Sequence, residues 1–223
     1  MRVSRLSADQ RAHWNQTYGA HPGMYGTEPS VPAVHAATIF RPGGEILELG
    51  AGHGRDALFF AQRGFRVRAS DFSAEGLEQL DVAAAGLPVR TFVHDVREPL
   101  PLPDASVDGV FAHMLLCMAL TTGQIRALTH EVARVLRPGG AFVYTVRHVG
   151  DAHFGIGTDH GDNIYETGGF AVHFFDRGLV DDLAGGWNLI EITDLTEGEL
   201  PRRLWRVTLH KPDDVDFTAR AAR

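Results

Sequence analysis

Short apolar runs alternate with amphipathic segments along most of this chain. A hydrophobic period of two residues is typical of strands, and a period of 3.6 residues is typical of helices. The pattern predicts strands at residues 45–49, 66–70, 89–94, 107–112, 141–146, 189–193 and 205–210. It predicts helices at residues 9–20, 33–40, 55–62, 73–85 and 122–136, with a further helix around 179–183.

The alternation of strands and helices from residue 45 to residue 146 is typical of right-handed βαβ units. Such units build a parallel sheet with helices on both faces. The last two predicted strands are close in sequence and form an antiparallel hairpin at its edge. We therefore expect an α/β fold in a single domain, with a doubly wound, Rossmann-like seven-stranded sheet that is mostly parallel and has an antiparallel last strand.

Within this single domain of residues 1–223, the Gly and Pro residues mark four parts. Residues 1–40 form an N-terminal helical lid, and residues 41–146 form the βαβ core. Residues 147–178 are a long polar loop, and residues 179–212 form the C-terminal strands. A long loop in a compact domain is often functional.

The chain carries a formal net charge of −7 and a single cysteine. The negative charge argues against nucleic acid or an anionic membrane as a partner, because both favour clustered Lys and Arg. One cysteine cannot form an intrachain disulfide, and we find neither a signal peptide nor an apolar run of membrane-spanning length. We expect a cytoplasmic protein without nucleic-acid or membrane partners, present as a monomer or a homodimer.

Gly50, Gly52 and Gly54 separate the first predicted strand from a predicted helix. A strand, a glycine-rich turn and a helix N-terminus are a general device for holding a nucleotide-like ligand close to bare backbone. The G-x-G-x-x-G fingerprint of dinucleotide-binding proteins fits poorly, because the third glycine comes one residue early. Glu48 would also be awkward beside a pyrophosphate, whereas it suits a ligand with positive charge.

Four segments within residues 45–146 resemble class I S-adenosylmethionine-dependent methyltransferases. The stretch ELGAGHG from residue 48 is similar to the family's E/D-x-G-x-G-x-G motif, and acidic residues follow at the ends of the second and third strands. Residues 100–110 and 134–140 resemble the segments that lead into the family's fourth and fifth strands. The resemblance implies S-adenosyl-L-methionine as the cofactor.

The same resemblance assigns roles to individual positions. Asp71 would accept both ribose hydroxyls, although capping the next helix is an alternative for its carboxylate. Asp95 would lie near the adenine amino group, and Val96 would offer its amide to the ring. The expected cofactor contacts are Tyr18, Tyr25, Glu48, Gly50, Ala51, Gly52, Gly54, Asp71, Phe72, Asp95, Val96 and Ala112.

Residues 14–18 and 24–30 resemble the lid of small-molecule methyltransferases of the tellurite-resistance and thiopurine type. In those proteins the lid folds over the methionine end of the cofactor. This implies contacts of Tyr18 and Tyr25 around the sulfonium, but both tyrosines could instead only pack the lid onto the domain.

Methyl transfer from a sulfonium requires alignment of nucleophile, methyl group and sulfur, and exclusion of water. A general base helps when the acceptor is a hydroxyl or an ammonium. His113 and His148 follow the fourth and fifth strands, where the acceptor should lie. We therefore expect His113, His148 and Tyr25 to be catalytic, the alternative for each histidine being a structural role.

The polar loop admits two interpretations. Its His and Asp side chains could bind zinc or iron, but they lack a compact ligand spacing, so we expect no metal. We prefer an acceptor-side cover in which Tyr165, Glu166 and His173 contact the substrate. Beyond the loop, Arg202 and Arg203 could meet an acidic acceptor, or they could be solvated or paired with acidic residues at 197 and 199.

The sequence thus predicts an enzyme that transfers a methyl group from S-adenosyl-L-methionine to a small-molecule acceptor with an N, O or S nucleophile, by in-line displacement. A protein methyltransferase and a binding protein without turnover, which senses the cofactor or S-adenosylhomocysteine, are the alternatives. A nicotinamide-dependent reductase would need the wider glycine spacing.

Overall fold

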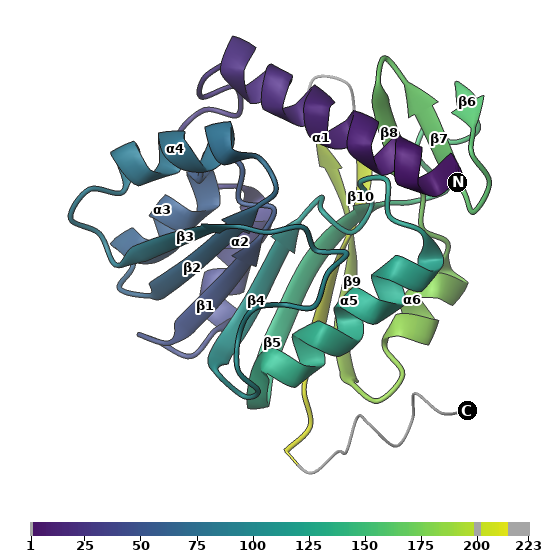
Figure 1. Ribbon diagram of the computed structural model, residues 1–223. Helices are drawn as coiled ribbons and strands as arrows, with labels where there is room; N and C mark the ends of the chain where they lie inside the picture. The colour runs from purple at the N-terminus through teal and green to yellow at the C-terminus, as the bar shows by residue number, and fades with distance from the viewer. Residues whose placement is uncertain (1, 199–201, 214–223) are drawn as a thin grey trace.

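A seven-stranded sheet forms the centre of the computed structural model, which describes residues 2–198 and 202–213 (Figure 1). The strand order is β3-β2-β1-β4-β5-β10-β9. The strands are β1 (Glu45–Leu49), β2 (Arg66–Asp71), β3 (Val89–Val93), β4 (Val107–His113), β5 (Leu136–Arg147), β9 (Asn188–Glu197) and β10 (Arg202–His210). The helices are α1 (Arg2–Ala20), α2 (Val31–Ile39), α3 (Arg55–Gln62), α4 (Ala74–Ala83), α5 (Thr122–Val135) and α6 (Arg177–Leu183).

The pairing of the strands confirms the predicted topology. Strands β1 to β5 pair in parallel, and β10 is antiparallel to both of its neighbours, β5 and β9. The chain winds outward from β1 to β3 and then returns to place β4 on the other side of β1. This reversal creates the crevice in which α/β sheets of this kind hold ligands, at the carboxyl ends of the strands.

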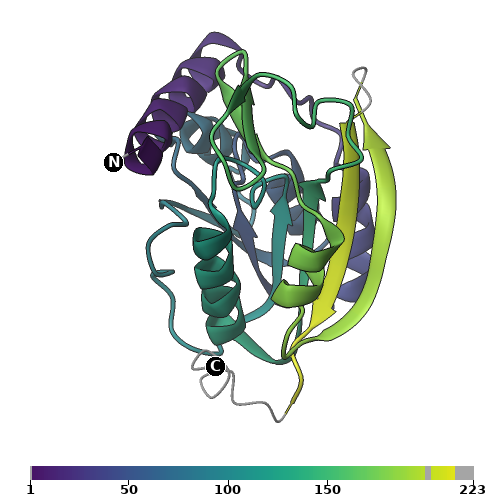
Figure 2. The same ribbon diagram turned by 90° about the vertical axis from the view of Figure 1, so that its right-hand side faces the viewer.

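Two apolar layers cover the sheet. Phe60 of α3 and Leu80 of α4 belong to one buried cluster, together with side chains of α2. Leu128 of α5 and Val180 of α6 belong to the cluster on the other face. Figure 2 shows α5 and α6 on one side of β9 and β10 and α2 on the other. No helix in the described residues has both the length and the apolar character needed to cross a membrane.

Local capping fixes where several helices begin. The Thr121 side chain accepts from the Gln124 amide while the Gln124 side chain accepts from the Thr121 amide, which is a capping box for α5. Ser30 caps α2, and Ser73 caps α4. The alternative role of Asp71 as the cap of α4 is therefore wrong, since Ser73 holds that position.

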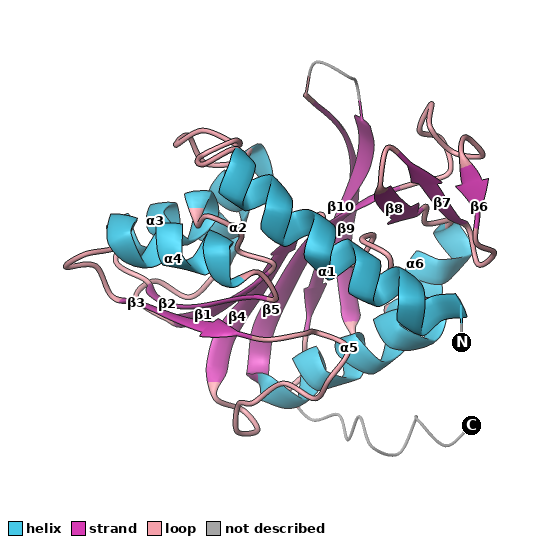
Figure 3. Cartoon of the chain, turned by 45° about the horizontal axis from the view of Figure 1, so that its top comes forward, coloured by secondary structure: helices cyan, strands magenta, loops and turns pink. Residues whose placement is uncertain are grey.

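Helix α1 is longer than the predicted 9–20, because neither Gly nor Pro interrupts residues 2–18. It crosses the carboxyl-terminal edge of the main sheet (Figures 1 and 3). Strand β5 also starts earlier than the predicted residue 141. Its pairing with β4 shifts register around Gly139 and Gly140, so the predicted turn is an irregularity inside the strand.

The prediction of a loop for residues 147–178 is wrong. This segment folds into a small antiparallel sheet of β6 (Thr158–Asp159), β7 (Ile164–Thr167) and β8 (Phe170–His173), which lies beside α1. Gly168 and Gly169 join β7 to β8 with φ of 60° and 84°. A Gly-Gly pair with positive φ at both residues is the signature of a tight hairpin, and this signal was in the sequence.

The glycine turn after β1 is packed by the protein itself. Gly54 has a φ of 88° and caps α3, and a Cβ there would lie 2.2 Å from Leu80 Cδ1. A Cβ on Gly50 would lie 3.0 Å from Leu115 Cδ1. The turn therefore needs glycine for its backbone conformation and for its own packing, before any ligand is considered.

We expect Gly54→Ala to lower the free energy of unfolding by about 2–5 kcal/mol, since overpacking and left-handed backbone both add cost. Gly64→Ala is the matched control, because Gly64 has the same φ of 88° with no atom within 4 Å of its Cβ position. It should lose only about 1–2 kcal/mol. Urea unfolding measures the free energy of unfolding of both variants. Equal losses of stability would show that the Leu80 side chain can move away from the new Cβ at no cost.

Candidate active site

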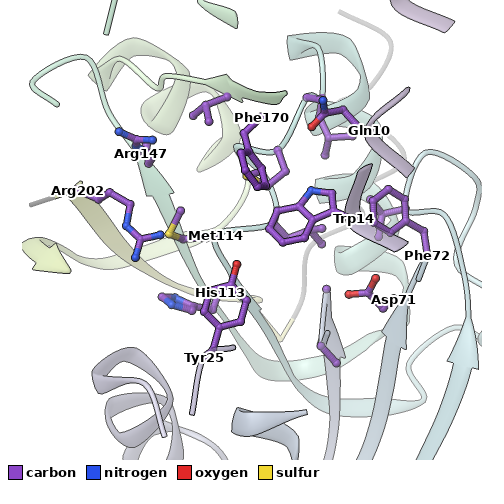
Figure 4. A pocket seen from close by; sticks show the side chains of 18 of the residues that line it. Gln10, Trp14, Tyr25, Asp71, Phe72, His113, Met114, Arg147, Phe170 and Arg202 are labelled. Atoms are coloured by element: carbon purple, nitrogen blue, oxygen red, sulfur yellow. The ribbon is translucent and has the colours of Figure 1, made fainter. Parts of the chain in front are cut away.

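A cavity of about 730 Å³ opens at the carboxyl ends of the central strands, beneath α1. Its walls come from α1, the glycine turn, the ends of β2 to β5 and the small sheet. Figure 4 shows Asp71 and Phe72 at one side of it and Arg147, Arg202 and His113 at the other, with Trp14 of α1 between them. We name these two sides the cofactor side and the acceptor side.

Most of the expected cofactor contacts meet in this cavity. Those that line it are Tyr18, Tyr25, Glu48, Gly50, Ala51, Asp71, Phe72, Asp95 and Val96. They come from α1, the lid loop and the ends of three strands, so the fold brings together residues up to 78 positions apart, as counted from Tyr18 to Val96.

Glu48 lies at the end of β1 with 3% of its surface exposed. Its Oε2 atom has no hydrogen-bond partner within the described part of the chain. Burial, with the nearby negative charge of Asp56, raises the pKa of Glu48 well above its ordinary value. A buried carboxylate that lacks a donor and faces a cavity is suited to a cationic ligand.

Asp71 is tied to the glycine turn. Its Oδ2 accepts from the Gly52 amide at 2.8 Å, and its Oδ1 accepts from the Ser73 amide at 2.9 Å. Burial raises the pKa of Asp71, although these amides act in the opposite direction. A carboxylate has about four lone-pair positions, so each oxygen keeps one for a hydroxyl of a ligand.

Asp95 is engaged by a residue that the sequence analysis overlooked. Arg97 Nε donates to Asp95 Oδ1 at 2.8 Å, and Arg11 of α1 lies 3.7 Å from Oδ2. Burial acts against ionisation, but the hydrogen bonds from Arg97 prevail and lower the pKa of Asp95. An arginine two residues after the acid was the available signal.

Four expected site residues do not line the cavity. Ala112 is buried in the apolar cluster beneath the sheet, and Gly54 packs against Leu80. A Cβ on Gly52 would meet the Tyr18 hydroxyl at 2.3 Å rather than open space. The expectation that Gly52 is bare only to admit the cofactor is therefore incomplete, because Tyr18 already uses that space.

His148 is the fourth of these residues. Its ring stacks on Trp205 with centroids 4.4 Å apart, and its Nδ1 accepts from the Gly150 amide at 3.0 Å. Burial lowers the pKa of His148. The structure gives His148 a packing position on the outer strands, which corresponds to the structural alternative, and we assign it no part in catalysis.

His113 faces the acceptor side, and both of its ring nitrogens are engaged. Nδ1 lies 2.8 Å from Thr145 Oγ1, and Nε2 lies 3.3 Å from Glu197 Oε1. Thr145 Oγ1 accepts from the Met114 amide at 2.9 Å, which leaves its proton free to be donated. An ionised Glu197 can only accept, so a neutral His113 carries its proton on Nε2 and accepts at Nδ1.

The lid and the small sheet close over the cavity through direct contacts. The Gln10 side chain donates to the Gly169 carbonyl at 2.7 Å and accepts from the Ala171 amide at 3.3 Å. Trp14 packs edge-on against Phe170 of β8. Tyr25 stacks on His53 and points its hydroxyl into the cavity (Figure 4). The cover is therefore built from both α1 and residues 147–178.

The acceptor side also has an apolar wall that the sequence analysis did not identify. It consists of Met114, Leu115, Met118, Tyr165, Phe170, Val172 and Phe174. Met114 and Ala119 hold backbone φ values of 56° and 52°, an uncommon conformation outside glycine, in the turn after β4. Strained residues of this kind often occur where a site fixes side-chain positions.

Of the substrate contacts expected in residues 147–178, Tyr165 lines the cavity. Glu166 instead pairs with His160 at 2.8 Å, and His173 is buried with Nδ1 at 2.7 Å from the Leu120 carbonyl. Among the residues that the structure describes, no group of three His, Cys, Asp or Glu side chains is placed to hold a metal ion. Residue 199, which was one of the two acidic partners considered for Arg202 and Arg203, lies outside the described residues.

Residues 46–140 match the protein family described as a methyltransferase domain. The chain is similar to dimethylglycine N-methyltransferase of Parasynechococcus marenigrum, with 34% identity over 157 residues that cover 62% of this chain and 55% of that protein. The chain spans about half the length of the curated relatives it matches.

Two solved structures share the fold. The first is 1,6-didemethyltoxoflavin-N1-methyltransferase of Burkholderia thailandensis with bound S-adenosylhomocysteine, with a TM-score of 0.73, 20% identity and coverage of 94% of this chain and 90% of that one. The second is TehB of Haemophilus influenzae, with a TM-score of 0.61, 16% identity and coverage of 80% and 61%.

The fold and the glycine turn define a Rossmann-like α/β protein with its site at the carboxyl edge of the sheet. The comparisons confirm the predicted resemblance to S-adenosylmethionine-dependent methyltransferases: residues 46–140 match a methyltransferase domain, and the chain is similar to a curated N-methyltransferase.

We expect Glu48→Gln to stabilise the ligand-free protein by about 1–3 kcal/mol near pH 8, the range for a buried polar group without a partner. A raised folded-state pKa means that the cost of Glu48 grows as the pH rises above its ordinary value of 4.5, so the gain should vanish toward that pH. Urea unfolding at several pH values measures it.

Glu45→Gln on the same strand is the control with the opposite sign. Despite some burial, hydrogen bonds from Arg68 and Arg66 lower the pKa of Glu45. Glu45 therefore stabilises the protein at neutral pH and loses this contribution as the pH falls. Glu45→Gln should lower the stability near pH 8, and a loss of stability for Glu48→Gln as well would contradict our account of Glu48.

Proposed function

We propose that this protein transfers a methyl group from S-adenosyl-L-methionine to a small-molecule acceptor. The observation that carries the proposal is the buried carboxylate of Glu48, which faces the cavity with an unpaired oxygen beside the glycine turn. A sulfonium or ammonium group would supply the missing positive partner. The methyltransferase relatives support the reaction class. An acidic residue before the glycine turn would be awkward beside the pyrophosphate of a dinucleotide, which argues against a reductase.

The residues present fit the proposed cofactor on chemical grounds. Asp71 keeps free acceptor positions for ribose hydroxyls, and Phe72 offers an apolar face to an adenine ring. Asp95 and the Val96 amide lie at the same side of the cavity. When bound, the cofactor supplies an activated methyl group, and the chain has only to orient the acceptor and exclude water.

A cavity that is covered from two sides favours a small acceptor over a protein side chain. Trp14 and Phe170 meet above the cavity, and Gln10 ties α1 to the small sheet, so the site is covered from two sides. The relative from Parasynechococcus marenigrum is named for dimethylglycine, which is a small amine. We assign the cover to water exclusion and acceptor binding.

The proposed route for a proton from the acceptor runs through Glu197. Its Oε2 has no hydrogen bond in the described residues, and its carboxylate is held by His113. Although burial opposes it, the hydrogen bond from His113 keeps the pKa of Glu197 low, so the group is ionised at neutral pH. We propose that His113 orients Glu197 rather than accepting a proton itself, and that Tyr25 contributes to acceptor alignment.

Calorimetry and label transfer test the function. The protein should bind S-adenosylmethionine but not NADH, and labelled methyl should reach one class in a panel of thiols, amines, phenols and carboxylic acids. Binding of the cofactor with no transfer to any class would favour a sensor without turnover. Binding of NADH alone would overturn the proposal.

The two-sided cover predicts a specific defect for Gln10→Ala. Loss of both bonds to the β7–β8 hairpin should let water reach the site, so we expect turnover to fall by about tenfold or more while cofactor affinity changes little. Gln16→Ala, on an exposed position of the same helix, is the control and should keep full turnover. Equal turnover of both variants would show that the cover does not depend on this contact.

A further inference from the structure

The acceptor side of the cavity contains two arginines that the cofactor does not require. Arg147 ends β5, and Arg202 begins the neighbouring strand β10. Both line the cavity, and Figure 4 shows them on the same wall, with the Arg202 guanidinium directed toward Met114 and His113. Two guanidinium groups on one wall can donate hydrogen bonds to an anionic ligand.

Arg147 is buried and held in a fixed orientation. Its Nε and Nη2 donate to the two carboxylate oxygens of Asp151 at 3.1 and 2.6 Å. Asp151 also accepts from the backbone amides of His153 and Arg203, both at 2.8 Å. The guanidinium lies over the Phe174 ring at 5.0 Å. Its Nη2 also lies 2.8 Å from His153 Nδ1. Its Nη1 donates to no atom in the described residues, so this one nitrogen is left to donate to a ligand.

Arg202 has no ion pair in the part of the chain that the structure describes, although it lies opposite Glu197 in the β9–β10 register. The Glu197 carboxylate is held instead by His113, at 3.2 Å, and lies 3.9 Å from Arg55. Arg203, the next residue, pairs with Asp194 at 2.7 Å. Arg202 therefore acts on Glu197 only through its charge, which, against the effect of burial, helps to lower the pKa of that carboxyl group, and its N–H groups make no hydrogen bond in the described residues.

We propose that the methyl acceptor is a small carboxylic acid whose carboxylate is anchored by Arg147 and Arg202. The planar guanidinium of Arg202 can match a carboxylate with two parallel hydrogen bonds, and Arg147 adds a single donor, Nη1. The apolar wall formed by Met114, Met118 and Phe170 receives the body of the acid. This inference rests on the proposed function and adds the chemical class of the acceptor.

Calorimetry on the protein saturated with S-adenosylhomocysteine tests the assignment. The probes are benzoate and hexanoate, each compared with its neutral amide, benzamide or hexanamide. The affinity for each acid should be higher than the affinity for its amide by about tenfold or more, as expected for charge-assisted hydrogen bonds. Arg202→Gln should remove most of this preference.

Arg203→Gln is the matched control and should keep the preference, because its side chain turns to Asp194. Arg147→Lys keeps a charge beside Asp151 but loses the Nη1 donor, and it should also reduce the preference about tenfold. Each variant must still bind S-adenosylhomocysteine, which shows that the site is folded.

The failures can be told apart. A wild-type protein that does not bind S-adenosylhomocysteine overturns the proposed function and this inference with it. Cofactor binding with acids that bind no more tightly than their amides overturns the inference alone. The same holds if Arg202→Gln keeps the full preference for the acid.

Discussion

Glu48 places a carboxylate at the floor of the cavity, where one of its oxygens has no hydrogen-bond donor in the described residues. A buried, unpaired carboxylate lowers the stability of a folded protein. This cost is relieved when the carboxylate takes up a proton or binds a cation. The surrounding groups do not relieve it, because Asp56 and Asp71 add negative charge and only the charge of Arg55 acts in its favour. On the cofactor side, the charge of Glu48 is therefore not balanced by the protein, and a cationic ligand would balance it.

The glycine turn beside Glu48 gives room to the protein's own side chains, whereas the sequence indicates that it gives room to a ligand. Bare backbone suggests a ligand lying against the turn, whereas the space beside Gly52 is taken by the Tyr18 hydroxyl and that beside Gly54 by Leu80. The glycines let α1 and α4 pack against the turn. In doing so they shape the floor of the cavity and fix the position of Asp71, which binds the Gly52 amide.

The sequence predicts the βαβ core well because hydrophobic period, capping residues and glycines agree there; β1 and α3 match their predicted bounds. It misses the small sheet, since β6 to β8 are too short for a clear period and only Gly168-Gly169 marks the hairpin. Within the site, motif positions such as Glu48 and Asp71 are predictable. The pairing of Asp95 with Arg97, the engagement of both His113 nitrogens and the position of His148 against Trp205 depend on tertiary contacts, which no local pattern encodes.

The most direct test of the central claim is the number of protons released when S-adenosylmethionine binds, obtained by calorimetry near neutral pH in buffers of different ionisation enthalpy. Burial keeps Glu48 protonated more than an ordinary carboxyl group, and a cationic partner would ionise it. We predict net proton release in the wild-type protein and its loss in Glu48→Gln. Binding without proton release, or release that persists in Glu48→Gln, would contradict the role of Glu48 as the counter-charge of the cofactor.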